Sequence, residues 1–399
     1  MAKVVAGLFM LTVLDSAVVA YADDDTDEAP VGWVLTETQG FHPPPRDSAS
    51  VFDIPGNDAF GIFGGYSEAL DISGTTSPTS NTFFNDLFIF DASSRTWTRR
   101  SSGEGPAPRG FACAVYHEGT ESVLVFGGSH FEADFSAFTY FDDLWRFDLS
   151  TNEWTEIQPV GPRPLARAGC GCDIIGDGLF VFSGNGENFS TDNELWRYDI
   201  VSQSWARLQA DDVGDPSRPA ARTQMIFIRI PTHNKFLMIG GDAFVQLPHP
   251  PFLDARTQED VWIYDANRNH WTEFAPKNTP EPARNHRAYA MISERLLLVQ
   301  NGDAQSDATT QQTCPPPLSC LIPPTPTNDT FVYDIKLERW TEIGLSPGTV
   351  PPTRRSTMRR VGETLYLFGG YGWDGDNAVG KVTNPYTWEL DLGQMRDDD

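Results

Sequence analysis

Short apolar runs that end at glycine recur six times along the chain. They read FGIFGG, VLVFGG, LFVFSG, FLMIGG, LLLVQNG and LYLFGG. No long stretch shows the periodicity of a helix, and apolar runs bounded by turn residues are typical of buried β-strands. The pattern therefore predicts an all-β protein built from one repeated unit.

Each unit carries further markers at fixed spacing. A second apolar segment follows each run and ends in Asp: LFIFD (87–91), LWRFD (144–148), LWRYD (195–199), VWIYD (261–265), FVYD (331–334) and WELD (388–391). In the first five units a Trp stands six residues after that Asp: Trp97, Trp154, Trp205, Trp271 and Trp340. Upstream of each run lies an arginine that precedes a small, mostly apolar segment: Arg46, Arg109, Arg167, Arg222, Arg284 and Arg354.

Each unit thus offers four short strands, named a (after the Arg), b (into glycine), c (into Asp) and d (around Trp). One four-stranded sheet cannot bury both of its faces, but sheets arranged around an axis can, which predicts a propeller. The sixth unit has no Trp after Asp391, whereas Trp33 lies thirteen residues before Arg46, where a d strand belongs. We therefore expect a six-bladed ring over residues 31–393, closed by an N-terminal strand near Trp33.

The spacing of Gly127-Gly128, Phe147 and Trp154 resembles the kelch repeat, and this resemblance covers nearly the whole chain after its N-terminal segment. It implies a kelch-type β-propeller and says little about function. Two units depart from the glycine pair, with Ser183-Gly184 and Asn301-Gly302. Asn tolerates positive φ, whereas Ser fits the turn less well.

Antiparallel strand order places the b–c loops, the d–a linkers and the arginines on one face of the ring. The long b–c loops are 66–84, 129–141, 242–258, 303–327 and 371–385, and loops of such length are often functional. Their aromatic residues are candidate contacts for a protein or glycan partner: Phe131, Phe135, Phe138, Phe244, Phe252, Tyr371 and Trp373. The alternative is that these loops fold back and bury their own side chains.

The six repeated arginines permit two interpretations. A ring of arginines at a channel mouth could hold an acidic ligand, as the resemblance to adaptor-type kelch proteins implies. One arginine at the same place in every unit also suits a structural role, and we favour that role. Arg287, Arg355 and Arg359 depart from the repeat and are the better ligand candidates.

Charge and the terminal segments narrow the choice of partners. The 399 residues carry a formal net charge of −26, which disfavours nucleic acid and anionic membranes. Residues 1–22 read as a signal peptide, 23–30 and 394–399 as acidic segments, and no other stretch is apolar enough to insert into a membrane. These features predict a secreted protein, and its oligomeric state is left open.

Secretion gives meaning to the cysteines and to two sequons. Cys314 and Cys320 flank PPPLS in the longest loop and are predicted to form a disulfide. Cys113, Cys170 and Cys172 are expected to be small buried residues, with a bridge from Cys113 to Cys170 or Cys172 as an alternative. Asn188 and Asn328 are candidate glycosylation sites.

The sequence shows no catalytic motif. Seven histidines are scattered over the units, and neither the copper ligands of galactose-oxidase-like kelch enzymes nor the Glu-x3-Asp-x3-His triplet of plant specifier proteins is recognisable. We therefore expect a protein- or glycan-binding module without catalytic residues, metal or cofactor. A metal-dependent oxidase or lyase with a site built from distant loops, and a structural component of a wall or matrix, remain alternatives.

Overall fold

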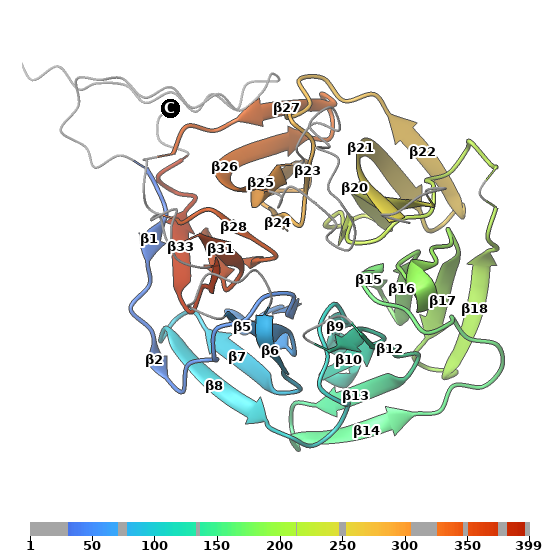
Figure 1. Cartoon of the computed structure of the whole chain (residues 1–399), viewed down its shortest axis with the longest axis horizontal. Coiled ribbons are helices and arrows are strands. Elements are labelled where there is room, and N and C mark those ends of the chain that lie inside the picture. Colours follow the sequence, from blue (N-terminus) through green and yellow to red (C-terminus); the bar gives the residue numbers. More distant parts are fainter. Residues whose placement is uncertain are drawn as a thin grey trace, which may run out of the picture.

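A computed structural model describes residues 31–395, except for 71–77, 133–135, 213, 247–252, 305–324, 346–349 and 374–380. Six four-stranded antiparallel blades stand around a central axis (Figure 1), which confirms the predicted propeller. The predicted signal peptide and acidic segment, and the end of the acidic tail, lie outside the described residues. No helix in the described ranges is long and apolar enough to cross a membrane.

The four strands of each blade follow the order expected from the repeat. The inner a strands are β3 (Ser50–Ile54), β9 (Cys113–His117), β15 (Gly171–Ile175), β19 (Ile226–Arg229), β24 (Ala288–Met291) and β29 (Thr357–Val361). The b strands are β4 (Ala59–Phe63), β10 (Ser122–Phe126), β16 (Gly178–Phe182), β20 (Lys235–Gln246), β25 (Leu296–Ala304) and β30 (Thr364–Phe368). The c strands are β7 (Leu87–Asp91), β13 (Leu144–Asp148), β17 (Leu195–Asp199), β21 (Leu253–Asp265), β26 (Thr325–Asp334) and β33 (Thr387–Asp391). The outer d strands are β8 (Thr96–Ser101), β14 (Glu153–Ile157), β18 (Ser204–Gln209), β22 (His270–Phe274), β27 (Arg339–Glu342) and β1 (Val34–Leu35).

Shorter strands lie outside the four strands of each blade. Those strands are β2 (Gln39–Gly40), β5 (Tyr66–Leu70), β6 (Pro78–Phe83), β11 (Ser129–Phe131), β12 (Phe138–Tyr140), β23 (Arg284–Asn285), β28 (Thr353–Arg354), β31 (Tyr371–Trp373) and β32 (Lys381–Thr383). Two single-turn 3-10 helices, η1 (Glu118–Thr120) and η2 (Glu187–Phe189), complete the described elements.

The repeated Asp and Trp are explained by the hairpin between strands c and d. In blade 3 the Asp199 carboxylate accepts the backbone N–H of Ser202 at 2.9 Å and so closes the c–d turn. Trp205 then lies opposite Tyr198, with ring centroids 5.3 Å apart. The fixed Asp-to-Trp offset is therefore the register of this hairpin.

The glycine pair ends strand b in a left-handed turn. In blade 1 the φ angles of Gly64 and Gly65 are +64° and +90°, and in blade 3 those of Ser183 and Gly184 are +53° and +102°. The Ser183 hydroxyl accepts the N–H of Arg222 at 2.8 Å, so a hydrogen bond across the blade junction helps to hold this unfavourable conformation. Serine therefore keeps the turn that the other blades build with glycine or asparagine.

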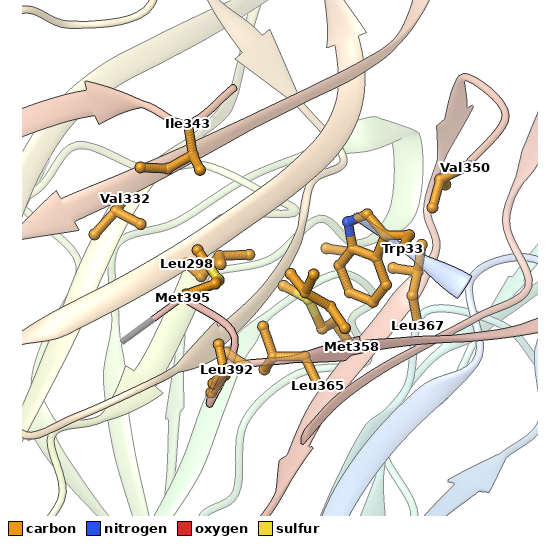
Figure 2. Close-up of a cluster of buried hydrophobic side chains, with 13 residues drawn as sticks. Trp33, Leu298, Val332, Ile343, Val350, Met358, Leu365, Leu367, Leu392 and Met395 are labelled. Atoms are coloured by element: carbon orange, nitrogen blue, oxygen red, sulfur yellow. The ribbon is translucent and has the colours of Figure 1, made fainter. Parts of the chain in front are cut away.

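The N-terminal strand closes the ring as predicted. β1 pairs antiparallel with β33, so that Leu35 lies opposite Trp388. Trp33 is 2% exposed and packs among Leu298, Met358 and Leu367 (Figure 2). Its indole N–H donates to Gln300 Oε1 of blade 5 at 3.0 Å. Three other d-strand tryptophans reach back in the same way to the preceding blade: Trp97 to Thr387, Trp154 to Ser101 and Trp271 to Gln209.

A disulfide joins the inner strands of blades 2 and 3. Cys113 of β9 and Cys172 of β15 are bonded, with their Cα atoms 6.0 Å apart. The bridge from Cys113 to Cys172, which the sequence left as the alternative, is therefore the one that forms, because the facing surfaces of neighbouring a strands bring the two side chains together. Cys170 remains a free thiol, and burial raises its pKa to about 11. Cys314 and Cys320 lie outside the described residues.

Candidate functional site

The repeated arginines of blades 1 to 5 are buried and bind within their own blades. Arg222 is typical: its Nη1 and Nη2 lie 2.5 and 2.8 Å from the two Asp260 carboxylate oxygens. Its Nη1 also donates to the Gly240 carbonyl at 3.0 Å, and its Nε donates to the Ala220 carbonyl at 2.9 Å. The corresponding pairs in the other four blades are Arg46–Asp86, Arg109–Asp143, Arg167–Asp192 and Arg284–Asp329.

Sequence reasoning missed the aspartates that bind these arginines. The sequence did contain a signal for them, because an Asp stands just before the c segment in five units. In the sixth unit the few residues that end at Tyr386 occupy this place, and none of them is an Asp. Blade 6 accordingly breaks the pattern. Its Arg354 reaches out of the blade to Asp303 of blade 5 at 3.1 Å and lies over the Tyr371 ring, 5.0 Å from the centroid.

A hoop of backbone hydrogen bonds joins neighbouring blades just before the inner strands. One residue of each blade, just before strand a, has a left-handed backbone: Ser48, Phe111, Gly169, Gln224, His286 and Arg355. The N–H of each donates to the carbonyl of its counterpart in the preceding blade at five junctions, over 2.7 to 3.3 Å. Among the described residues no such bond joins His286 to Gln224, so the hoop is open between blades 4 and 5.

Side chains replace the missing backbone bond at this junction. His286 lies between two carboxylates, with Nδ1 2.9 Å from Asp303 Oδ2 and Nε2 3.8 Å from Asp242 Oδ2. The Asn285 side-chain amide donates to Asp242 across the junction at 2.8 Å. Burial and the positive charge of Arg355 hold the pKa of His286 below its usual value, against the opposing effect of Asp303 and Asp242. The neutral imidazole therefore donates from Nδ1, while its buried Nε2 has no hydrogen-bond partner.

The long b–c connections form hairpins, which we call the crown. The crown consists of β5–β6, β11–β12, β31–β32 and the extensions of β20–β21 and β25–β26 beyond their glycine turns. In blade 3 the connection is short and contains η2, with Asn185 bridged to Thr191. The crown is therefore low over blade 3 and rises over the other blades.

The candidate aromatic residues do not form one exposed surface. Phe131 is 6% exposed and packs against Tyr66 and Phe83, and half-buried Phe138 lies against this cluster. Tyr371 is buried beneath Arg354. Phe244 and Trp373 lie on β20 and β31, whereas Phe135 and Phe252 lie outside the described residues.

The three candidate arginines occupy three different places. Arg287 forms an ion pair with Glu259 of blade 4 beside the open junction. Arg355 lies at the mouth, where its guanidinium stands over the Phe111 ring and donates to the Tyr66 hydroxyl at 2.8 Å.

Arg359 lies deeper, on the inner strand β29. Its Nε is 3.2 Å from Asp53 Oδ1 of blade 1, and its Nη2 donates to the Val51 carbonyl at 2.8 Å. Of the three arginines, Arg355 is therefore the one that stands at the entrance on the crowned face.

The two candidate sequons also lie on the crowned side. Asn188 is exposed on η2, and Asn328 is exposed on β26, where its carbonyl accepts a hydrogen bond from Gln300. No group of three His, Cys, Asp or Glu side chains in the described ranges is arranged to hold a metal ion.

Known proteins share this repeat. The family model of the KLHDC2/KLHL20/DRC7 Kelch-repeats domain matches residues 69–302. The leucine-zipper-like transcriptional regulator 1 homolog of Drosophila melanogaster is 26% identical over 67% of this chain and 25% of its own length. Kelch domain-containing protein 10 of Xenopus tropicalis is 26% identical over 61% of this chain and 53% of that protein.

Another relative carries the name of an enzyme, and the alignment covers more of its own length than that of the two relatives above. The N-(sulfonatooxy)prop-2-enimidothioate sulfolyase of Thlaspi arvense is 22% identical over 84% of this chain and 89% of that protein. The first relatives are much longer, and the chain spans only about a quarter of the regulator homolog. The family match covers more than half of the chain, and the six blades, the glycine turns and the Trp register agree with it. The chain therefore belongs to the KLHDC2/KLHL20/DRC7 kelch-repeat family.

Proposed function

We propose that the chain is a protein-binding module that takes an extended segment of its partner across the crowned face. The observation that carries this proposal is the crown itself, since five hairpins rise from one face of the ring and the connection over blade 3 is short. The low side over blade 3 gives a segment a way in, and a rigid ring holds the hairpins in place. Kelch propellers generally act as protein-interaction modules, which agrees with this use of the face.

Arg355 is the residue at the mouth best suited to contact such a segment. It is half-buried, and its guanidinium lies over the Phe111 ring and donates to the Tyr66 hydroxyl. The repeated arginines of blades 1 to 5 are more deeply buried and bind carboxylates of their own blades. A partner carboxylate or carbonyl near Arg355 would gain a charge-assisted hydrogen bond.

Panning a random library of displayed peptides of roughly a dozen residues tests the proposal, because extended peptides are a common mode of recognition. Enriched peptides should bind the wild-type protein and lose at least about tenfold in affinity with Arg355→Glu, since truncated charge pairs at interfaces cost several kcal/mol. The matched control is Arg268→Glu, whose side chain is 82% exposed on the c–d turn of the opposite face.

The result can go against the proposal in two ways. A library that yields no specific peptide would argue that the face does not take extended segments. Peptides that lose affinity equally with Arg268→Glu would place the contact elsewhere or show only a response to net charge. Melting curves of both variants establish that each remains folded.

A further inference from the structure

A cavity of about 610 Å³ lies beneath the linker that joins blade 4 to blade 5. Its walls come from linker residues 278–281, from Arg284, from Asp329 and Phe331 at the start of strand c, and from residues 339–342 of the outer strand. Known small-molecule sites commonly have volumes of about 300 to 1,000 Å³. The cavity is separate from the crown hairpins and from Arg355.

The other blades show what is different about this place. In blades 1 to 4 the repeated arginine donates its Nε to the carbonyl two residues earlier and its Nη1 to the first residue of the glycine turn. In blade 5 the Nη1 of Arg284 donates instead to Pro282, and its Nε has no partner. The repeated arginine is therefore turned from its usual position where it lines the cavity.

Other polar atoms of the lining also lack partners. Arg284 is 8% exposed, and beside it Asp329 Oδ1 and the Trp340 indole nitrogen are buried without a hydrogen bond. Leaving a buried donor or acceptor unpaired is unfavourable. Arg284, Trp340 and Asp329 thus bring donor and acceptor groups to the walls of the cavity, although these three atoms are themselves covered. A molecule that both accepts and donates hydrogen bonds suits walls of this polarity.

The charge of the lining indicates what kind of molecule would fit. Two guanidinium groups, of Arg284 and Arg339, are offset by the carboxylates of Glu281, Asp329 and Glu342. A lining of mixed charge gives little advantage to an ionic ligand, whereas hydroxyl groups can pair with carboxylates and guanidinium groups alike. The half-buried Phe331 ring adds an apolar surface against which a sugar ring can lie.

We propose that this cavity is a binding site for a neutral saccharide. Glu281, Arg339 and Glu342 are exposed at its edge and would contact the outer hydroxyls. Arg284 and Asp329 would contact the hydroxyls that enter furthest. The site would work independently of peptide binding at the crown.

The first measurement is an array of uncharged mono- to tetrasaccharides, with sialylated and sulfated saccharides as the anionic comparison. The best uncharged hit is then titrated by calorimetry against wild type, Glu342→Gln and Arg339→Ala. Each substitution should weaken binding at least about tenfold, because each removes a hydrogen bond between a charged side chain and the saccharide. Both side chains are exposed, so folding should be unaffected.

The repeat supplies a matched control. Glu273 stands two residues after Trp271 of blade 4, as Glu342 stands two residues after Trp340 of blade 5, and it does not line the cavity. Glu273→Gln should leave saccharide affinity unchanged. Arg355→Glu should leave it unchanged as well, which separates this site from the crown.

Three results would overturn the inference. If no uncharged saccharide binds, the cavity does not take this class of ligand. If anionic saccharides bind more strongly than uncharged ones, the ligand is anionic and the proposal of a neutral saccharide is wrong. Binding that survives both Glu342→Gln and Arg339→Ala would move the site away from this cavity.

Discussion

His286 stands where the backbone hoop is open, and its side chain takes part in a different set of bonds from its counterparts in the other blades. It faces Asp303 of its own blade, Asp242 of blade 4 and the guanidinium of Arg355 of blade 6. Burial favours the neutral form, because desolvation penalises the imidazolium. The pKa of His286 is therefore lower in the folded protein than the usual value of about 6.5 in an unfolded chain.

This shift gives the junction a sensitivity to acid. A group whose pKa is lowered on folding binds more protons in the unfolded state, so its contribution to stability is present above about pH 6.5 and is lost as the pH falls. We expect His286→Gln to reduce the fall in the free energy of unfolding between roughly pH 7 and pH 5. Urea denaturation at several pH values measures this free energy.

The control for this experiment is His233→Gln, an exposed histidine in blade 4. It should keep the wild-type dependence on pH. If His286→Gln shows the same slope as the wild type, His286 does not couple folding to protonation.

At the level of strands, the sequence predicted the repeated Asp and Trp positions but missed the aspartates that pair with the repeated arginines. The Asp-to-Trp offset located the c–d hairpins, because two residues in register across a tight turn have a fixed separation in sequence. The sequence did not reveal the role of Asp260 and its counterparts, since each pairs with an arginine 25 to 45 residues away. The crown hairpins were expected as loops, because their strands carry polar residues and lack the apolar pattern of the blades.

Departures from the repeat were also hard to interpret from sequence alone. Gln300 replaces an apolar residue at the end of strand b, and its side chain is buried. In the structure it accepts hydrogen bonds from Trp33 and Thr330 and donates to Asn301 and the Asn328 carbonyl. The substitution therefore serves the closing strand, which lies 267 residues away.

The closing strand gives a sharp prediction for stability. Trp33→Ala removes a buried indole and leaves a cavity between blades 5 and 6, and such changes cost about 3 to 5 kcal/mol. We expect a matching fall in the free energy of unfolding, measured by urea denaturation. Val34→Ala is the control, because Val34 is 58% exposed on the same strand, and its effect should stay within about 0.5 kcal/mol.

A small effect of Trp33→Ala would have a clear meaning. If the loss equals that of Val34→Ala, the N-terminal strand does not hold the ring closed. The pairing of β1 with β33 would then contribute little to the stability of blade 6.

Taken as a whole, the ring has six junctions that are not equivalent. A disulfide strengthens the one between blades 2 and 3, and Trp33 and Gln300 join blades 5 and 6. Between blades 4 and 5 the hoop lacks its backbone bond, and the side chains of Asp242, Asn285 and His286 take its place. Because these side chains are polar and one of them titrates, this junction is the place where the ring should open first.

Amide hydrogen exchange at single-residue resolution tests this view of the molecule. The His286 N–H should exchange at least about tenfold faster than the hoop amides of Phe111, Gly169 and Gln224, because local opening requires less free energy where hydrogen bonds are missing. Equal protection at all four amides would show that the side chains close the junction as firmly as a backbone bond does.

Closure of the ring by β1 also determines on which face the two described ends of the chain emerge. Val31 packs against the buried cluster that contains Met395, and Figure 2 shows Met395 in that cluster. Both described ends of the chain therefore emerge at one place. Strand order puts that place toward the c–d turns, opposite the crown, because β33 runs away from the crowned face and β1 runs toward it. A tether on either end would therefore hold the ring at the face opposite the crown and leave the crowned face pointing outward.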